Sequence, residues 1–97
     1  MADILLSRRA RDELSHLPEQ ERARVRRALQ ALRAGAPNLD IRPLVGAQPW
    51  LRLRVGDIRV LFRRLPAGDI EPAGTIFVGR VVNRRGLDDA VGSLPLV

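Results

Sequence analysis

The sequence lacks several of the side chains on which enzyme sites commonly depend. It contains no cysteine and no tyrosine, and His16 is its one histidine. Without cysteine the chain has no disulfide, no thiolate nucleophile and no cysteine-ligated metal, and one histidine does not make a zinc site alone. Lysine is also absent, so every basic residue is an arginine. We therefore expect no cofactor and no catalysis by a thiolate or a lysine amine.

The chain also lacks a long apolar run. A transmembrane helix needs roughly 20 consecutive apolar residues, and the apolar stretch in residues 1–6 is too short for the core of a signal peptide. At 97 residues, the chain is long enough for one modest hydrophobic core. We therefore expect a single soluble domain over residues 1–97, located in the cytoplasm.

Positive charge, in contrast, is abundant. The 17 arginines outnumber the 11 acidic residues, which gives a formal net charge of +6 and a pI of about 11.6. Such an excess favours a polyanionic partner.

The segment from Trp50 to Leu65 alternates apolar and basic residues on both sides of Gly56-Asp57. Alternation with a period of two is typical of a half-buried strand, and Gly-Asp between two such runs predicts a tight hairpin. With these two residues as the turn, Arg54 opposes Arg59. One face then carries an apolar set, which we expect to face the core: Leu51, Leu53, Val55, Ile58, Val60 and Phe62. The other face carries Trp50, Arg52, Arg54, Arg59, Leu61 and Arg63.

This second face has two interpretations. Like charges that oppose each other directly, such as Arg54 and Arg59, destabilise a sheet, so the face is either a solvated surface or an anion site. Guanidinium groups bind phosphate bidentately and stay charged at any working pH. With Trp50 placed to stack a base, the arrangement is typical of a site for single-stranded nucleic acid.

The other elements are predicted from periodicity and from glycine and proline. We expect a short buried strand at residues 3–6, a helix from Arg8 to His16 capped by Ser7, and a second helix with Pro18 at its first position and Gly35 just beyond its end. The arginines on the outer face of the second helix form either a solvated face or a nucleic-acid patch.

The second half of the chain is predicted in the same way. Prolines and glycines predict that residues 36–49 lack regular structure, with Leu39, Ile41 and Leu44 pinning them to the core. Thr75 to Val82 is predicted to be a central strand. The pattern leaves the side taken by Arg80 open, since Val78 and Val82 share its parity. Residues 87–91 are predicted to form a turn of helix. Residues 92–97 are predicted to form a tail that is frayed or ordered by a partner.

Taken together, these features resemble the RelE/ParE superfamily of small bacterial toxins from type II toxin–antitoxin systems. The resemblance rests on Leu44-Val45-Gly46, on the hairpin from Trp50 to Phe62, and on Val82-Asn83-Arg84-Arg85. It implies an α+β fold in which an N-terminal strand and a two-helix antiparallel hairpin precede a three-stranded antiparallel meander, forming one mostly antiparallel sheet. It also implies an antitoxin partner, which we expect to be acidic where it covers the arginine face.

Two branches of the superfamily differ in their target. RelE-like members cleave mRNA on the ribosome, whereas ParE-like members inhibit DNA gyrase. Carried over residue by residue, the resemblance implies catalytic roles for Arg52, Arg54, Arg59 and Arg85, with Arg84 as the alternative to Arg85. From their place on the arginine face or at the end of the last strand, we expect Trp50, Arg63 and Arg84 to bind substrate. RelE-like nucleases commonly place a tyrosine a few residues after the last arginine, and here residues 86–91 contain none.

Metal-free RNA cleavage needs a base for the 2′-hydroxyl proton, cations for the phosphorane and an acid for the leaving oxygen. Arginine serves the second need, but its guanidinium group stays protonated at any working pH and is therefore unsuited to the others. The carboxylates predicted nearby are Asp57, Asp88 and Asp89, each of which also has a structural role as a turn former or helix N-terminal charge. Three hypotheses follow: a ribosome-dependent endoribonuclease toxin, a gyrase-inhibiting toxin, and a nucleic-acid-binding protein without catalysis.

Overall fold

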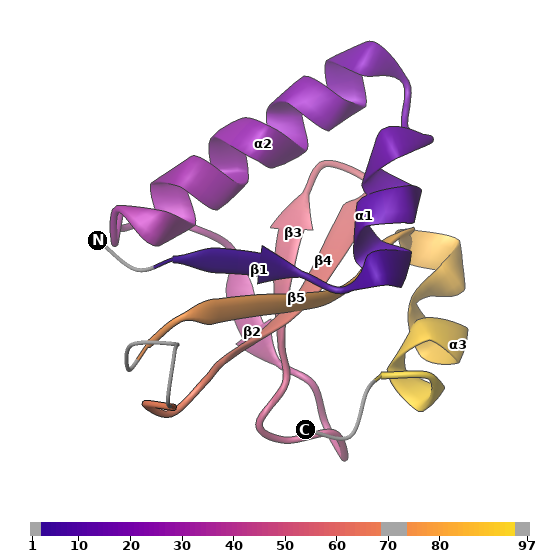
Figure 1. Cartoon of the computed structure of the whole chain (residues 1–97). Helices are drawn as coiled ribbons and strands as arrows, with labels where there is room; N and C mark the ends of the chain where they lie inside the picture. The colour runs from indigo at the N-terminus through magenta and orange to yellow at the C-terminus, as the bar shows by residue number, and fades with distance from the viewer. Residues whose placement is uncertain (1–2, 69–73, 95–97) are drawn as a thin grey trace.

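The computed structural model describes residues 3–68 and 74–94, in which one sheet is flanked by helices (Figure 1). The strands are β1 (Ile4–Leu6), β2 (Ile41–Pro43), β3 (Leu51–Val55), β4 (Ile58–Arg64) and β5 (Ile76–Asn83). Their order across the sheet is β1-β5-β4-β3-β2. β1 runs parallel to β5, and the other neighbouring pairs are antiparallel. The predicted α+β class and the mostly antiparallel sheet are therefore confirmed.

Two helices, α1 (Arg8–Ser15) and α2 (Glu19–Arg33), lie between β1 and β2 in the chain. The Ser7 hydroxyl oxygen accepts a hydrogen bond from the Ala10 N–H at 3.0 Å, which confirms Ser7 as the N-cap of α1. Pro18 occupies the N-cap position of α2, one residue earlier in the helix than predicted. Gly35, with a φ of +73°, lies just beyond the end of α2 as expected.

The face of the sheet toward α1 and α2 carries the main hydrophobic core. Its buried members are Ala10, Leu14, Val25, Leu29 and Leu32 from the helices and Leu53, Ile58, Val60, Phe62, Ile76, Val78 and Val81 from the strands. Arg54 pairs with Arg59 and Val55 with Ile58, so the predicted hairpin register is confirmed. Because the turn fixes this register, the predicted apolar face lies against the helices.

A β-bulge in β5 decides the side that Arg80 takes. Leu61 pairs with Arg80, whereas the next residue of β4, Phe62, pairs with Val78, so Gly79 is the extra residue. An extra residue reverses the alternation of side chains. Consequently Val78 and Val81 both belong to the core beside the helices, and Arg80 shares the opposite face with Leu61.

Part of that opposite face is covered by α3 (Leu87–Gly92), which follows the short 3₁₀ helix η1 (Arg84–Gly86). Leu44, Trp50 and Leu61 are buried here with Ala90 of α3. A Cβ atom at Gly79 would lie 2.7 Å from Cη2 of Trp50, so the bulge residue must be glycine for the indole to fit. This second hydrophobic cluster confirms the short helix and the anchoring of Leu44.

The prediction that residues 36–49 lack regular structure is wrong for Ile41–Pro43, which form β2. Pro43 pairs with Leu51 at the end of an edge strand, where a missing N–H is tolerated. Leu39 and Ile41 pack against the main core, as expected. The predicted tail falls partly outside the described residues, since residues 95–97 are not among them.

An ion pair connects α1 to β5. The Arg80 Nη2 atom lies 2.8 Å from Oε2 of Glu13, and the exposed fractions of the two side chains are 8% and 21%. The Val81 N–H donates to Oε1 of Glu13 at 3.0 Å, and Arg80 Nη1 also donates to the Ser93 hydroxyl. Arg80 therefore serves the fold by joining α1 to the segment after α3. Among the helices of residues 3–68 and 74–94, none combines the length and hydropathy needed to span a bilayer.

Candidate nucleic-acid interface

Arginine side chains from three elements meet at the turn between β3 and β4. Gly56, with a φ of +60°, accepts hydrogen bonds on its carbonyl oxygen from Arg59 Nη1 at 2.8 Å and from Arg54 Nε at 3.5 Å. Arg24 of α2 lies against the same residue, because a Cβ atom at Gly56 would be only 2.9 Å from Arg24 Nη1. The left-handed backbone conformation favours glycine at this position, whereas the Arg24 guanidinium group could move away from an added Cβ atom.

Arg59 is the centre of this positive region. Burial lowers the pKa of its guanidinium group, and the charges of Arg54, Arg52 and Arg84 lower that pKa further, whereas Asp57 raises it. Each of these groups therefore lies within electrostatic reach of Arg59, with more positive than negative charge around it. We call Arg24, Arg52, Arg54, Arg59 and Arg84 the arginine cluster.

Asp40 is a carboxylate in direct contact with the cluster. Its Oδ1 accepts a hydrogen bond from Arg52 Nη2 at 2.9 Å, and its Oδ2 lies 4.0 Å from Arg54 Nη1. The backbone carbonyl of Asp40 also accepts the Arg54 N–H at 2.9 Å. Because the Arg52 side chain is 15% exposed and that of Arg54 is 55% exposed, Arg52 is held by Asp40 while Arg54 faces solvent.

The end of β5 adds Arg84 to the cluster. The Arg84 N–H donates to the Asp57 carbonyl at 2.9 Å, which places it beside the turn. The Asn83 side-chain oxygen accepts the N–H groups of Arg85 and Gly86, both at 3.0 Å, and so fixes the change from strand to η1. Of the two arginines predicted here, Arg84 is the one whose charge acts on Arg59.

Arg85, together with Arg84, lines a groove of about 400 Å³ beside the cluster. One wall comes from the connection between α1 and α2, and the other from the hairpin turn and η1. The lining residues are Leu17, Pro18, Glu21, Asp57, Ile58, Asn83, Arg84 and Arg85. Two carboxylates and two guanidinium groups thus share one groove next to the arginine cluster.

Trp50 and Arg63 do not join the cluster. Trp50 is 5% exposed and contacts the backbone at Gly79, so its ring has no open face on which a base could stack. The prediction that Trp50 stacks a substrate base is therefore wrong, because α3 and the bulge enclose the indole. The Arg63 guanidinium carbon lies 6.0 Å from the centroid of the Trp50 ring, near the end of β4 that is farther from the turn.

Sequence patterns missed Arg24 and Asp40. Arg24 lies on a helix whose arginines all look alike in the sequence, and only the packing of α2 beside the turn distinguishes it. Asp40 precedes a strand that the surrounding prolines concealed. A strand prediction for Ile41–Pro43 would have been the one signal able to place Asp40 beside Arg52.

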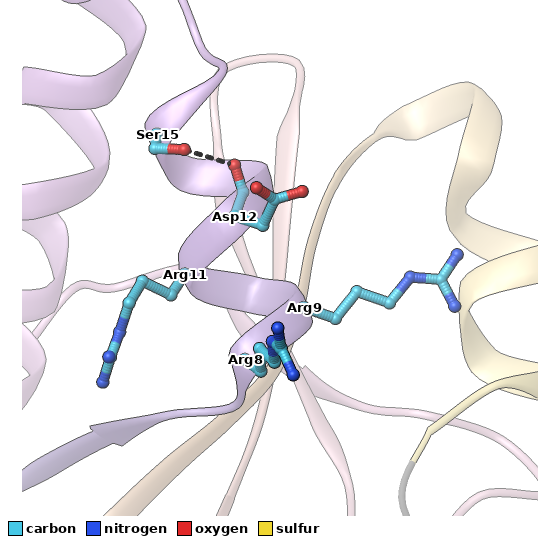
Figure 2. A pocket seen from close by; sticks show the side chains of 5 residues that line it. All are labelled: Arg8, Arg9, Arg11, Asp12 and Ser15. Carbon is cyan, nitrogen blue, oxygen red and sulfur yellow. Dashed lines mark hydrogen bonds between the residues drawn. The ribbon is translucent and has the colours of Figure 1, made fainter.

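A second arginine-rich surface lies on α1, where Arg8, Arg9 and Arg11 border an open hollow of about 850 Å³ with Asp12 and Ser15 (Figure 2). The Ser15 hydroxyl donates to the Asp12 carbonyl at 2.7 Å. Arg9 and Arg11 point away from each other in Figure 2 and do not converge on one point. None of the residues that line this hollow belongs to the hairpin.

The described part of the chain holds no group of three or more His, Asp or Glu side chains arranged to bind a metal ion. The candidate site therefore consists of guanidinium groups, the two nearby aspartates and the groove.

Comparisons with known proteins bear on the fold. No protein-family model matches the sequence, and neither does any curated protein. Among solved structures, the fold is similar to a chain in the crystal structure of the RelB-RelE antitoxin-toxin complex from Methanococcus jannaschii, with a TM-score of 0.66 and 23% sequence identity. The match covers 88% of this chain and 95% of that chain. At this identity the likeness establishes a RelE-like fold.

Proposed function

We propose that this protein is the toxin of a type II toxin–antitoxin system and that it inhibits translation by cutting mRNA on the ribosome. The observation that carries the proposal is the convergence of the arginine cluster on the Gly56-Asp57 turn, within a fold similar to a chain of an antitoxin–toxin complex. The cluster would bind the scissile phosphate. A cognate antitoxin with an acidic segment would cover the same surface and silence the toxin.

The energetics of the cluster support an anionic substrate. Arg54 and Arg59 oppose each other directly, an arrangement that destabilises a sheet in the absence of an anion. A phosphodiester placed among these groups would form charge-assisted hydrogen bonds and relieve the repulsion. The extra negative charge of the phosphorane would be stabilised more strongly than the ground state, which is what lowers a barrier.

Cleavage is tested in a translating extract, with RNA 5′ ends mapped by primer extension. We expect the wild-type protein to produce new ends within the message only when ribosomes are present. Arg59→Ala should reduce cleavage by about 100-fold or more, by analogy with the removal of one transition-state donor. The matched control is Arg27→Ala, an exposed arginine on α2 outside the cluster, which should cleave like the wild type. Intact message together with blocked growth of expressing cells would reject the proposal.

A second candidate is a toxin that binds and inhibits DNA gyrase without cleaving nucleic acid. Tyrosine, lysine and histidine are common proton carriers in catalysis. The chain contains no tyrosine and no lysine, and His16 lies at the exposed end of α1, outside the arginine cluster. This lack of proton carriers favours a toxin that acts by binding alone. A supercoiling assay with purified gyrase tests it, since unchanged supercoiling at saturating protein would exclude this candidate.

Binding without catalysis is distinguished by the salt dependence of affinity. If four arginines contact phosphates of single-stranded RNA, the logarithm of affinity should fall with the logarithm of salt concentration with a slope of about −3. That slope without any cleavage in the extract would indicate a nucleic-acid-binding protein. A slope near zero would show that the arginines do not contact RNA phosphates, and would exclude RNA as the ligand.

A further inference from the structure

RNA cleavage at the arginine cluster needs a group that takes a proton from the 2′-hydroxyl, and guanidinium groups do not serve this purpose at neutral pH. The described carboxylates near the cluster therefore have to be compared. Asp40 is bonded to Arg52 at 2.9 Å, and its backbone is fixed in the sheet, so it holds arginines in place. Asp88 and Asp89 lie in the first turn of α3, where they stabilise the helix N-terminus. Glu21 also lines the groove but lies in the first turn of α2, where it stabilises the helix N-terminus.

Asp57 differs from these four residues in its position. It belongs to the turn on which Arg24, Arg54 and Arg59 converge, and its carbonyl accepts the Arg84 N–H at 2.9 Å. Its side chain is exposed, lines the groove beside Arg84 and Arg85, and has no ion pair within 4.0 Å among the described residues. A carboxylate that is open to solvent and next to the phosphate-binding groups is free to approach a bound nucleotide.

We propose that Asp57 is a catalytic residue and that its carboxylate is the general base of the cleavage reaction. This inference rests on the proposed function, because it assigns a role within that reaction. The groove of about 400 Å³ would hold the nucleotide on one side of the scissile phosphate. The arginine cluster would hold the phosphate itself.

The step balances without a metal or a redox partner. Asp57 takes the 2′-hydroxyl proton, and the 2′-oxygen forms a bond to phosphorus. The bond from phosphorus to the 5′-oxygen breaks, and the electron pair leaves with that oxygen, which takes a proton from water. The products are a 2′,3′-cyclic phosphate and a 5′-hydroxyl, and the proton on Asp57 returns to solvent.

The charged groups around Asp57 come from each element that packs near the turn. Arg24 and Glu21 belong to α2, Arg52 and Arg54 to β3, Arg59 to β4, and Arg84 and Arg85 to η1. Most of them are positive, so a phosphate bound by these guanidinium groups would lie beside the Asp57 carboxylate.

The test is the extract cleavage assay with Asp57→Asn, which retains the turn-forming ability of the side chain and removes its charge. We expect its cleavage rate to fall by about 100- to 10,000-fold, the range for a lost general base, with RNA affinity equal to or above that of the wild type. Asp57→Glu should restore part of the rate. Glu19→Gln, an exposed carboxylate on α2 outside the groove, is the matched control and should cleave like the wild type.

The outcomes separate the two proposals. Wild-type cleavage with an unchanged rate in Asp57→Asn would overturn the role of Asp57 and leave the proposed function standing. A larger loss in an Asp88→Asn, Asp89→Asn double variant than in Asp57→Asn would do the same. If the wild type makes no cuts in the message, the proposed function fails and the assignment of Asp57 fails with it. A circular dichroism spectrum identical to that of the wild type shows that Asp57→Asn is folded.

Discussion

The two faces of the sheet differ in what covers them. The face toward α1 and α2 is covered along its length by one hydrophobic cluster. The opposite face is divided, with Trp50, Leu61 and Ala90 buried under α3 and the cluster arginines of β3 and β4, namely Arg52, Arg54 and Arg59, toward the hairpin turn. Alternation along a strand therefore tells which side a residue takes, but not which element lies over it.

The main hydrophobic core and the arginine cluster also differ in the sign of their contribution to stability. Side chains buried toward the helices stabilise the fold through removal of apolar area from water. Arginines that oppose each other at the turn destabilise it. Substitutions in the main hydrophobic core and in the arginine cluster should therefore have opposite effects on stability.

Phe62→Ala should have the largest effect on stability. Phe62 is 0% exposed in the core beside the helices, and truncation of such a side chain lowers the free energy of unfolding by about 3–5 kcal/mol. Urea denaturation followed by circular dichroism measures the change. A loss below about 1 kcal/mol would mean that this face is not the main core.

Gly79→Ala should have the next largest effect on stability. The added Cβ atom would lie 2.7 Å from Trp50 Cη2, so the indole has to move, at a cost of about 1–3 kcal/mol. Because Trp50 is the one tryptophan, its fluorescence emission should shift to the red. Gly92→Ala is the control, since a Cβ atom there would meet nothing within 4 Å, and its emission should match the wild type.

Arg54→Ala should leave the free energy of unfolding unchanged or raise it by up to about 0.5 kcal/mol, because a directly opposed like charge is removed. The same variant should make the salt dependence of RNA affinity shallower by about 0.7, the contribution of one phosphate contact. Filter binding over a salt series measures the slope, with Arg27→Ala expected to keep the wild-type value. If Arg54→Ala destabilised the protein as much as Phe62→Ala, the inference that the opposed arginines weaken the fold would be wrong.

Asp40→Asn should change the free energy of unfolding by less than about 1 kcal/mol, because its ion pairs are partly exposed. The substitution releases Arg52 for an RNA phosphate, so the salt dependence should become steeper by about 0.7. The same salt series measures this change. A shallower slope would show that Asp40 is needed to present Arg52 to the RNA.

The fold was largely predictable because its main signals are local. The turn at Gly56-Asp57 determines the pairing of every residue in the central hairpin, and Ser7 and Gly35 mark the helix ends. The side of Arg80 was not predictable, because parity arguments fail across a β-bulge. Strand β2 was hidden by its proline, which is acceptable only because the strand lies at the edge of the sheet.

The candidate site was predictable in part. The convergence of Arg52, Arg54 and Arg59 follows from the hairpin register, which the sequence determines. The burial of Trp50 depends on Gly79 and on α3 (Leu87–Gly92), which come much later in the chain. Arg24 and Asp40 reach the site only through tertiary packing, for which a single sequence has no local signal.

The parallel pairing of β1 with β5 has a consequence for how the chain folds. Ser7 and Gly79, which are joined by a hydrogen bond of 2.8 Å, are 72 residues apart in the sequence. Contacts of such separation slow folding, since a large loop must close before they form. During synthesis β1 therefore has no strand to pair with until β5 leaves the ribosome. We expect fragments that end before Ile76 to remain unfolded, so that the toxin activity proposed here would arise only after nearly the whole chain has been made.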